Sequence, residues 1–72
     1  MILNEVTCKV FKSKIIDEIF LDIKENFYTD LRNFLFVKTG KGWISIDEIQ
    51  VENKKRMNIG DFLRGNIIRS VL

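Results

Sequence analysis

Residues 33–46 read NFLFVKTGKGWISI, two apolar runs on either side of a turn that contains two glycines. Glycine adopts positive φ angles at little cost, so it is favoured where a chain reverses direction. Apolar runs that flank such a turn are typical of a β-hairpin. We therefore expect strands over 33–38 and 43–46, with aromatic side chains that pair across them.

A further strand is predicted before the hairpin, at residues 6–12. Val6, Cys8 and Val10 alternate with polar positions, and this period of two is typical of a half-buried strand. The strand would add to the same antiparallel sheet.

Residues 14–32 fit two structures. Apolar residues recur there every three or four positions, which favours an amphipathic helix capped by Ser13. Ile19, Leu21 and Ile23 also alternate with other residues, and the stretch is rich in β-branched and aromatic side chains, as strands are. Periodicity favours the helix, but the strand remains open.

Two helix signals follow the hairpin. Residues 45–48 read SIDE, which has the form of a capping box, although the strand would alternatively continue through Ile49 and Val51. Residues 58–71 carry an apolar stripe at helical spacing and predict a C-terminal helix that covers the sheet or a partner. The expected fold is α+β, a small antiparallel sheet of three to four strands with a C-terminal α-helix.

The length and composition predict one ordered domain over residues 1–72. The chain is 46% hydrophobic and 11% aromatic, which excludes a disordered tail. No apolar run reaches the roughly 18 residues of a membrane span, and the opening residues lack the features of a secretory signal. A single cysteine, Cys8, points to a reducing compartment, so we expect an intracellular protein and leave cytoplasmic and nuclear locations open.

The composition argues against catalysis. The chain has no histidine, so the Ser-His and Cys-His nucleophile pairs are excluded, and one cysteine cannot complete a zinc site of nitrogen and sulfur ligands. Residues 40–42, GKG, lack the length of a phosphate-binding loop. We predict a protein that is not an enzyme and has no metal or cofactor.

Charge is distributed unevenly. Residues 1–37 carry five basic and six acidic residues, whereas residues 38–72 carry seven basic and four acidic ones. A basic C-terminal half favours an anionic partner. Residues 54–56, KKR, are interpreted as a solvated surface turn.

Two segments resemble the positive-cofactor-four family of single-stranded-DNA-binding transcriptional coactivators. Residues 20–30, FLDIKENFYTD, are similar to its Asp-Ile-Arg strand, with Lys24 at the arginine, and residues 40–48, GKGWISIDE, to its Lys-Gly-Ile-Ser-Leu turn, with Trp43 inserted. The resemblance implies a curved antiparallel sheet with one helix, dimerisation through the helix, and a role in transcription regulation. It would also make residues 14–32 strand.

The leading functional hypothesis is a small non-enzymatic protein that binds single-stranded DNA or RNA on a basic, aromatic-bearing β-surface. Cations would neutralise phosphates while bases stack on rings. Phe34 and Phe36 are interpreted as core residues in preference to stacking residues. The predicted nucleic-acid contacts are Lys9, Lys12, Lys14, Lys24, Arg32, Lys38, Lys41, Trp43 and Tyr28.

Two alternatives remain open. A protein-interaction module, such as a phage or mobile-element inhibitor or adaptor, would bind a partner protein through the C-terminal helix and the acidic positions in 17–25. Double-stranded RNA binding ranks third, because residues 54–56 precede the C-terminal helix, where cations oppose the helix dipole unless an anion is bound. A domain with so small a core gains from dimerisation, so we also expect a homodimer.

Overall fold

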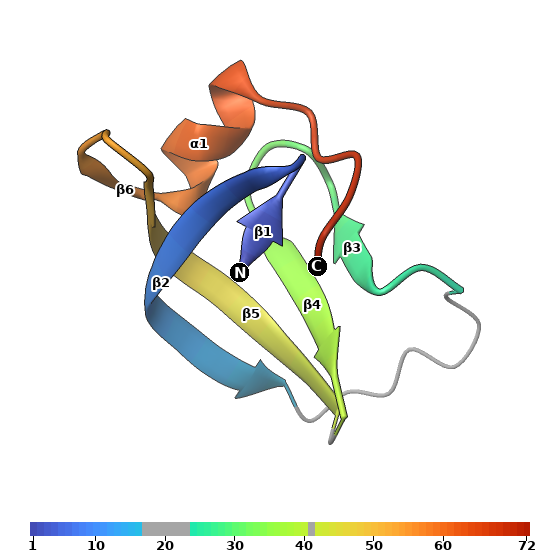
Figure 1. Ribbon diagram of the computed structural model, residues 1–72. Coiled ribbons are helices and arrows are strands. Elements are labelled where there is room, and N and C mark those ends of the chain that lie inside the picture. The colour runs from blue at the N-terminus through green and yellow to red at the C-terminus, as the bar shows by residue number, and fades with distance from the viewer. Residues whose placement is uncertain (17–23, 41) are drawn as a thin grey trace.

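The computed structural model describes residues 1–16, 24–40 and 42–72 (Figure 1). Within these ranges the chain forms an antiparallel sheet and one short helix, so the predicted α+β class is confirmed, with more strands than expected. No helix in the described ranges has the length and apolar character needed to cross a membrane. The elements are β1 (Ile2–Leu3), β2 (Val6–Ile16), β3 (Phe27–Thr29), β4 (Leu35–Thr39), β5 (Gly42–Val51), β6 (Arg56–Asn58) and α1 (Ile59–Gly65).

Strand β5 is the centre of the sheet. The strand order is β1-β2-β5-β4-β3, and β6 pairs with the far end of β5. The hairpin of β4 and β5 is confirmed: Leu35 lies opposite Ile46, and the turn between the strands reaches Gly42, whose φ is 143°. The long strand β2 curves strongly, so the sheet wraps around its own inner face (Figure 1).

The inner face holds the core. Leu35, Ile46 and Ile49 are fully buried, and α1 packs its apolar residues over them. The helix begins after Asn58, whose side chain accepts a hydrogen bond from the Asp61 amide at 2.8 Å. The remaining core residues come from both ends of the chain and from the sheet, and include Leu3, Cys8, Val37, Ile59, Phe62, Leu63, Ile68 and Val71.

Residues 45–48 are strand, which corrects the capping-box interpretation. The Ser45 hydroxyl donates to the Asp47 carboxylate at 2.9 Å, and the strand continues through Val51, as the alternative had it. Backbone pairing with β2 and β4 on both sides satisfies the groups that a helix would otherwise pair internally.

The C-terminal helix is shorter than the predicted range 58–71. It ends at Gly65, Asn66 is extended, and residues 67–72 form no further helix. The Asn66 side-chain amide donates to the Phe62 carbonyl at 2.9 Å, and Val71 forms a bridge to Leu3 on β1. Tertiary pairing with the N-terminus therefore overrides the helical spacing of the apolar residues.

Residues 14–32 fitted a helix or a strand: the helix is wrong wherever the structure describes that range, and the strand is confirmed at residues 14–16 and 27–29. Residues 14–16 belong to β2 and pair with residues 43–45 of β5, and residues 27–29 form β3 on the edge of β4. Cross-strand packing of β-branched and aromatic side chains decides these positions. Residues 17–23, with most of the acidic positions of the adaptor hypothesis, lie outside the described ranges.

The turn between β3 and β4 is organised by the Asp30 carboxylate. Its Oδ1 accepts from the amides of Arg32, Asn33 and Phe34 at 2.9, 2.7 and 3.2 Å, and its Oδ2 from the Asn33 side chain at 3.0 Å. These hydrogen bonds, that of the Asn33 amide foremost, lower the pKa of Asp30 to about 2.

This turn gives the fold a predictable sensitivity to acid. Because the folded-state pKa lies below the ordinary value of 3.8, ionised Asp30 stabilises the fold above about pH 4, and that contribution is lost as the pH falls towards 2. We expect the melting temperature, followed by circular dichroism from pH 6 to 2, to fall less steeply for Asp30→Asn than for the wild type. Glu25→Gln, at an exposed carboxylate elsewhere, should keep the wild-type profile. Parallel profiles for Asp30→Asn and wild type would contradict this role.

Candidate functional site

One transverse row of residues crosses four strands on the outer face of the sheet. Tyr28 lies opposite Phe36, Phe36 opposite Ser45, and Ser45 opposite Lys14. Directly opposed residues in antiparallel strands share a face, so rings and a cation lie on the same surface.

Three rings gather at one end of this row. Phe34 and Phe36 stack with centroids 4.4 Å apart, and Tyr28 lies 5.5 and 6.4 Å from them. Tyr28 is 44% exposed, and Phe34 and Phe36 are half-buried and outside the core cluster. Their ring contacts therefore stabilise the outer surface rather than the inner one.

A bulge places three lysines of β2 on this same face. Lys9 lies opposite Gln50, Lys12 opposite Glu48 and Lys14 opposite Ser45, with a register shift at Phe11. In a regular strand Lys9 would point away from Lys12 and Lys14, because side chains alternate. The extra residue at Phe11 restores Lys9 to their side.

Two further cations complete what we call the basic face: Lys9, Lys12, Lys14, Lys38 and Arg56. Lys38 lies opposite Trp43, which is two residues from Ser45 on β5 and so shares its face. Arg56 lies opposite Gln50, the residue that Lys9 also opposes. β2, β4 and β6 each contribute to one positively charged surface.

Two carboxylates lie among these cations. Glu48 pairs with Lys12 at 3.3 Å and with Arg56, and Asp47 pairs with Lys14 at 3.9 Å. The hydrogen bond from Arg56, and secondarily that from Lys12, lowers the pKa of Glu48. Glu48 thus stays ionised and holds its partners in place. Glu52 lines a hollow with Lys9, so five cations face three anions and the surface stays positive.

The other predicted contacts lie elsewhere. Arg32 is in the turn before β4, where it lines a hollow with Leu63 and Arg64 beside α1, and Lys24 is exposed outside the strands. Trp43 is only 6% exposed, so its ring is not presented for stacking as we expected. Lys41 lies outside the described residues.

Sequence reasoning missed two members of this surface, Phe11 and Arg56. Arg56 was interpreted as part of a solvated turn, yet its guanidinium carbon lies 4.6 Å from the centroid of the Phe11 ring. The run of basic residues at 54–56 could be read in the sequence, but the β-bulge that brings the lysines of β2 onto one face could not.

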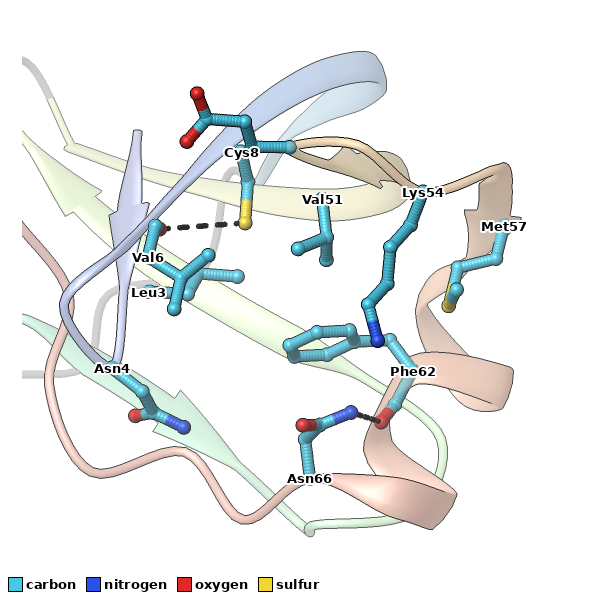
Figure 2. A pocket seen from close by; sticks show the side chains of 10 residues that line it. Leu3, Asn4, Val6, Cys8, Val51, Lys54, Met57, Phe62 and Asn66 are labelled. Carbon is cyan, nitrogen blue, oxygen red and sulfur yellow. Dashed lines mark hydrogen bonds between the residues drawn. The ribbon is translucent and has the colours of Figure 1, made fainter.

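The pocket in Figure 2 is a second feature, between the β1–β2 turn, the β5–β6 turn and α1. It measures about 300 Å³ and has an apolar floor that includes Leu3, Cys8 and Phe62, with Asn4 and Lys54 at its rim. The Cys8 thiol donates to the Val6 carbonyl at 3.6 Å, and burial raises its pKa, so it remains protonated and is a poor nucleophile.

Across residues 1–16, 24–40 and 42–72, no three His, Cys, Asp or Glu side chains come together to hold a metal ion. A curved antiparallel sheet with a positive outer face is instead typical of a domain that binds a polyanion.

Residues 1–66 match the family described as the formyl transferase C-terminal domain, and the chain belongs to that family. It is 43% identical over 63 residues to the methionyl-tRNA formyltransferase of Agathobacter rectalis, an alignment that covers 88% of this chain and 20% of that protein. It is 35% identical over 69 residues to the methionyl-tRNA formyltransferase of Clostridioides difficile, covering 96% of this chain and 22% of the relative. The chain thus spans about a fifth of the length of these relatives. No solved structure gives a significant match.

The family corrects several predictions. The chain is not a member of the positive-cofactor-four family, and single-stranded nucleic-acid binding, transcription regulation and the phage-adaptor alternative are wrong with it. The prediction that the protein is not an enzyme is also wrong at the level of the family, since the relatives are named as formyltransferases. The resemblance rested on short strand-and-turn patterns that any antiparallel hairpin produces.

The predicted homodimer is unsupported as well. It required an apolar helix face open to a second copy, but α1 has seven residues and its apolar side chains, Ile59, Phe62 and Leu63, are buried in the chain's own core. The helix therefore lacks the unpartnered surface that the prediction assumed.

Proposed function

We propose that this chain is the tRNA-binding domain of a methionyl-tRNA formyltransferase, and that its basic face holds the tRNA backbone while the formyl group is transferred elsewhere in the protein. The relatives act on methionyl-tRNA by name, and tRNA is a polyanion. The observation that carries the proposal is the bulge at Phe11, which brings Lys9, Lys12 and Lys14 onto one face.

We also propose a domain extent and a cellular location for this protein. Residues 1–72 act as one domain, which is supported by a core that joins β1, the sheet, α1 and the C-terminal segment. The protein works inside the cell, in the cytoplasm, because aminoacylated tRNA is found there and because the single cysteine is buried and forms no disulfide within the chain.

The test is tRNA binding as a function of salt. We expect the triple variant Lys9→Gln, Lys12→Gln, Lys14→Gln to bind a fluorescent methionine-accepting tRNA about tenfold more weakly at low salt, because three phosphate contacts are lost. The slope of log affinity against log salt should fall by about two to three. Fluorescence anisotropy between about 25 and 200 mM salt measures both quantities.

The matched control neutralises three cations off the basic face: Arg32→Gln, Arg64→Gln, Arg69→Gln. It changes net charge equally and should keep affinity within about threefold of the wild type. Equal losses in the two triple variants would show that net charge alone matters. Absence of wild-type binding at about 50 mM salt would refute the proposed function.

A further inference from the structure

Arg56 differs from the other cations of the basic face because two neighbours hold its guanidinium. Its Nε donates to the Glu48 carboxylate, and its plane lies over Phe11 with the guanidinium carbon 4.6 Å from the ring centroid. Glu48 is itself fixed by Lys12 at 3.3 Å. An arginine on a surface ordinarily samples many rotamers. The contacts with Glu48 and Phe11 restrict the rotamers of Arg56 before any ligand binds.

The restrained guanidinium still has donors to offer. A guanidinium carries five N–H groups in a planar fork, and Nε uses one of them on Glu48. Within the ranges that the structure describes, Nη1 and Nη2 make no hydrogen bond, and the side chain is 48% exposed. The open edge of such a fork matches two oxygens of a phosphate or carboxylate.

The surroundings of Arg56 favour a phosphate. Gln50 lies opposite both Lys9 and Arg56, and it lines a hollow of about 270 Å³ on the same side of the sheet. Lys9 also lines the hollow, and Glu52 is the acidic residue of the lining. The hollow is open to solvent, and the polar side chains of Thr7, Gln50 and Asn53 line it beside Lys9, so it offers hydrogen-bond partners to a sugar-phosphate unit.

We infer that Arg56 is the anchoring contact of the basic face, which takes one phosphodiester of the tRNA backbone in a bidentate hydrogen bond, with Phe11 and Glu48 as its positioning residues. The inference rests on the proposed function. The cations of the basic face then differ in how they bind phosphate. The lysines act as screened point charges, whereas Arg56 presents parallel N–H donors in a planar fork that a lysine cannot reproduce.

Arg56→Lys tests the geometry, because it keeps the charge and removes the fork. We expect tRNA affinity to fall about tenfold with an unchanged salt slope. The matched control, Arg69→Lys, makes the same exchange in the C-terminal segment and should bind as the wild type does. Urea unfolding of each variant checks that the fold is intact. Wild-type affinity in Arg56→Lys, or equal losses in both variants, overturns the inference.

A second pair of variants separates positioning from net charge. Glu48→Ala removes the carboxylate that pairs with Arg56, and Glu52→Ala removes the carboxylate that lines the hollow with Lys9 and Gln50, so simple electrostatics predicts tighter binding for both. We expect Glu52→Ala to tighten binding about twofold and Glu48→Ala to weaken it about threefold, because only Glu48 holds Arg56. Tighter binding by both variants overturns the inference and leaves the proposed function standing. A wild-type chain that does not bind tRNA refutes the proposed function itself.

Discussion

Replacing Ile46 with alanine is expected to lower the free energy of unfolding by about 2–5 kcal/mol, the usual cost of a large-to-small change in a packed core. Ile46 is fully buried at the middle of β5, directly between Ser13 on β2 and Leu35 on β4, and Leu35 is fully buried too. The surrounding strands are hydrogen-bonded on both sides of β5, so they cannot collapse into the space that the side chain leaves.

The size of the domain makes this loss severe. Stabilities of about 0.05–0.15 kcal/mol per residue give a 72-residue chain about 4–11 kcal/mol in total. Urea denaturation measures the change, and the single tryptophan, Trp43, is a suitable probe because it is buried in the folded state. The expected outcome is a clearly lower urea midpoint with an unchanged slope of free energy against urea.

The matched control is Ile15→Ala, the same substitution on the neighbouring strand at a side chain that is 83% exposed. Without a cavity to create, it should cost less than about 1 kcal/mol, mostly through lower strand propensity. Similar losses at Ile46 and Ile15 would mean that β5 is not the centre of the core.

The hairpin shows which parts of this fold a single sequence can predict. Turn glycines flanked by apolar runs are a local signal, and β4 and β5 formed where that signal lay. The range 14–32 offered two periods at once, and the choice between them depends on which strands lie alongside. Pairing of residues 14–16 with β5 and of 27–29 with β4 is tertiary information that no local pattern contains.

Part of the candidate site could likewise be predicted from the sequence, and the rest depends on tertiary contacts. Lys9, Lys12 and Lys14 were predicted as phosphate contacts, but in a regular strand Lys9 would lie on the opposite face from Lys12 and Lys14. Only the bulge at Phe11 unites them, and a bulge depends on the partner strand. Arg56 joins them from β6 because β6 pairs with the same segment of β5.

The C-terminal segment, where a longer helix was predicted, is instead held by contacts with Asn4. Asn4 and Glu5 have φ angles of 50° and 70°, so they form a two-residue turn of the type that suits a right-handed hairpin twist. The Asn4 side chain faces the other end of the chain: its Nδ2 donates to the Ile67 carbonyl at 2.7 Å, and its Oδ1 accepts from the amides of Arg69 and Ser70 at 2.6 and 3.2 Å.

Asn4→Ala is therefore expected to destabilise the fold by about 2–4 kcal/mol. The substitution removes three hydrogen bonds at about 1 kcal/mol each and places alanine at a positive φ that costs it about 1 kcal/mol more. It also loosens the segment that carries the buried residues Ile68 and Val71 into the core. Urea denaturation gives the free energy, and amide hydrogen exchange at Arg69 and Ser70 locates the change.

Asn4→Gly separates the two causes, because glycine accepts the positive φ but has no side chain to bind Ile67, Arg69 and Ser70. We expect Asn4→Gly to recover about 1 kcal/mol relative to Asn4→Ala and to leave the Arg69 and Ser70 amides as rapidly exchanging as in that variant. Full stability and protected amides in Asn4→Gly would assign the whole role of Asn4 to its backbone. Loss of protection in both variants would establish that the Asn4 side chain is needed, beside the backbone hydrogen bonds between residues 2–4 and 70–72, to hold the two ends of the chain together.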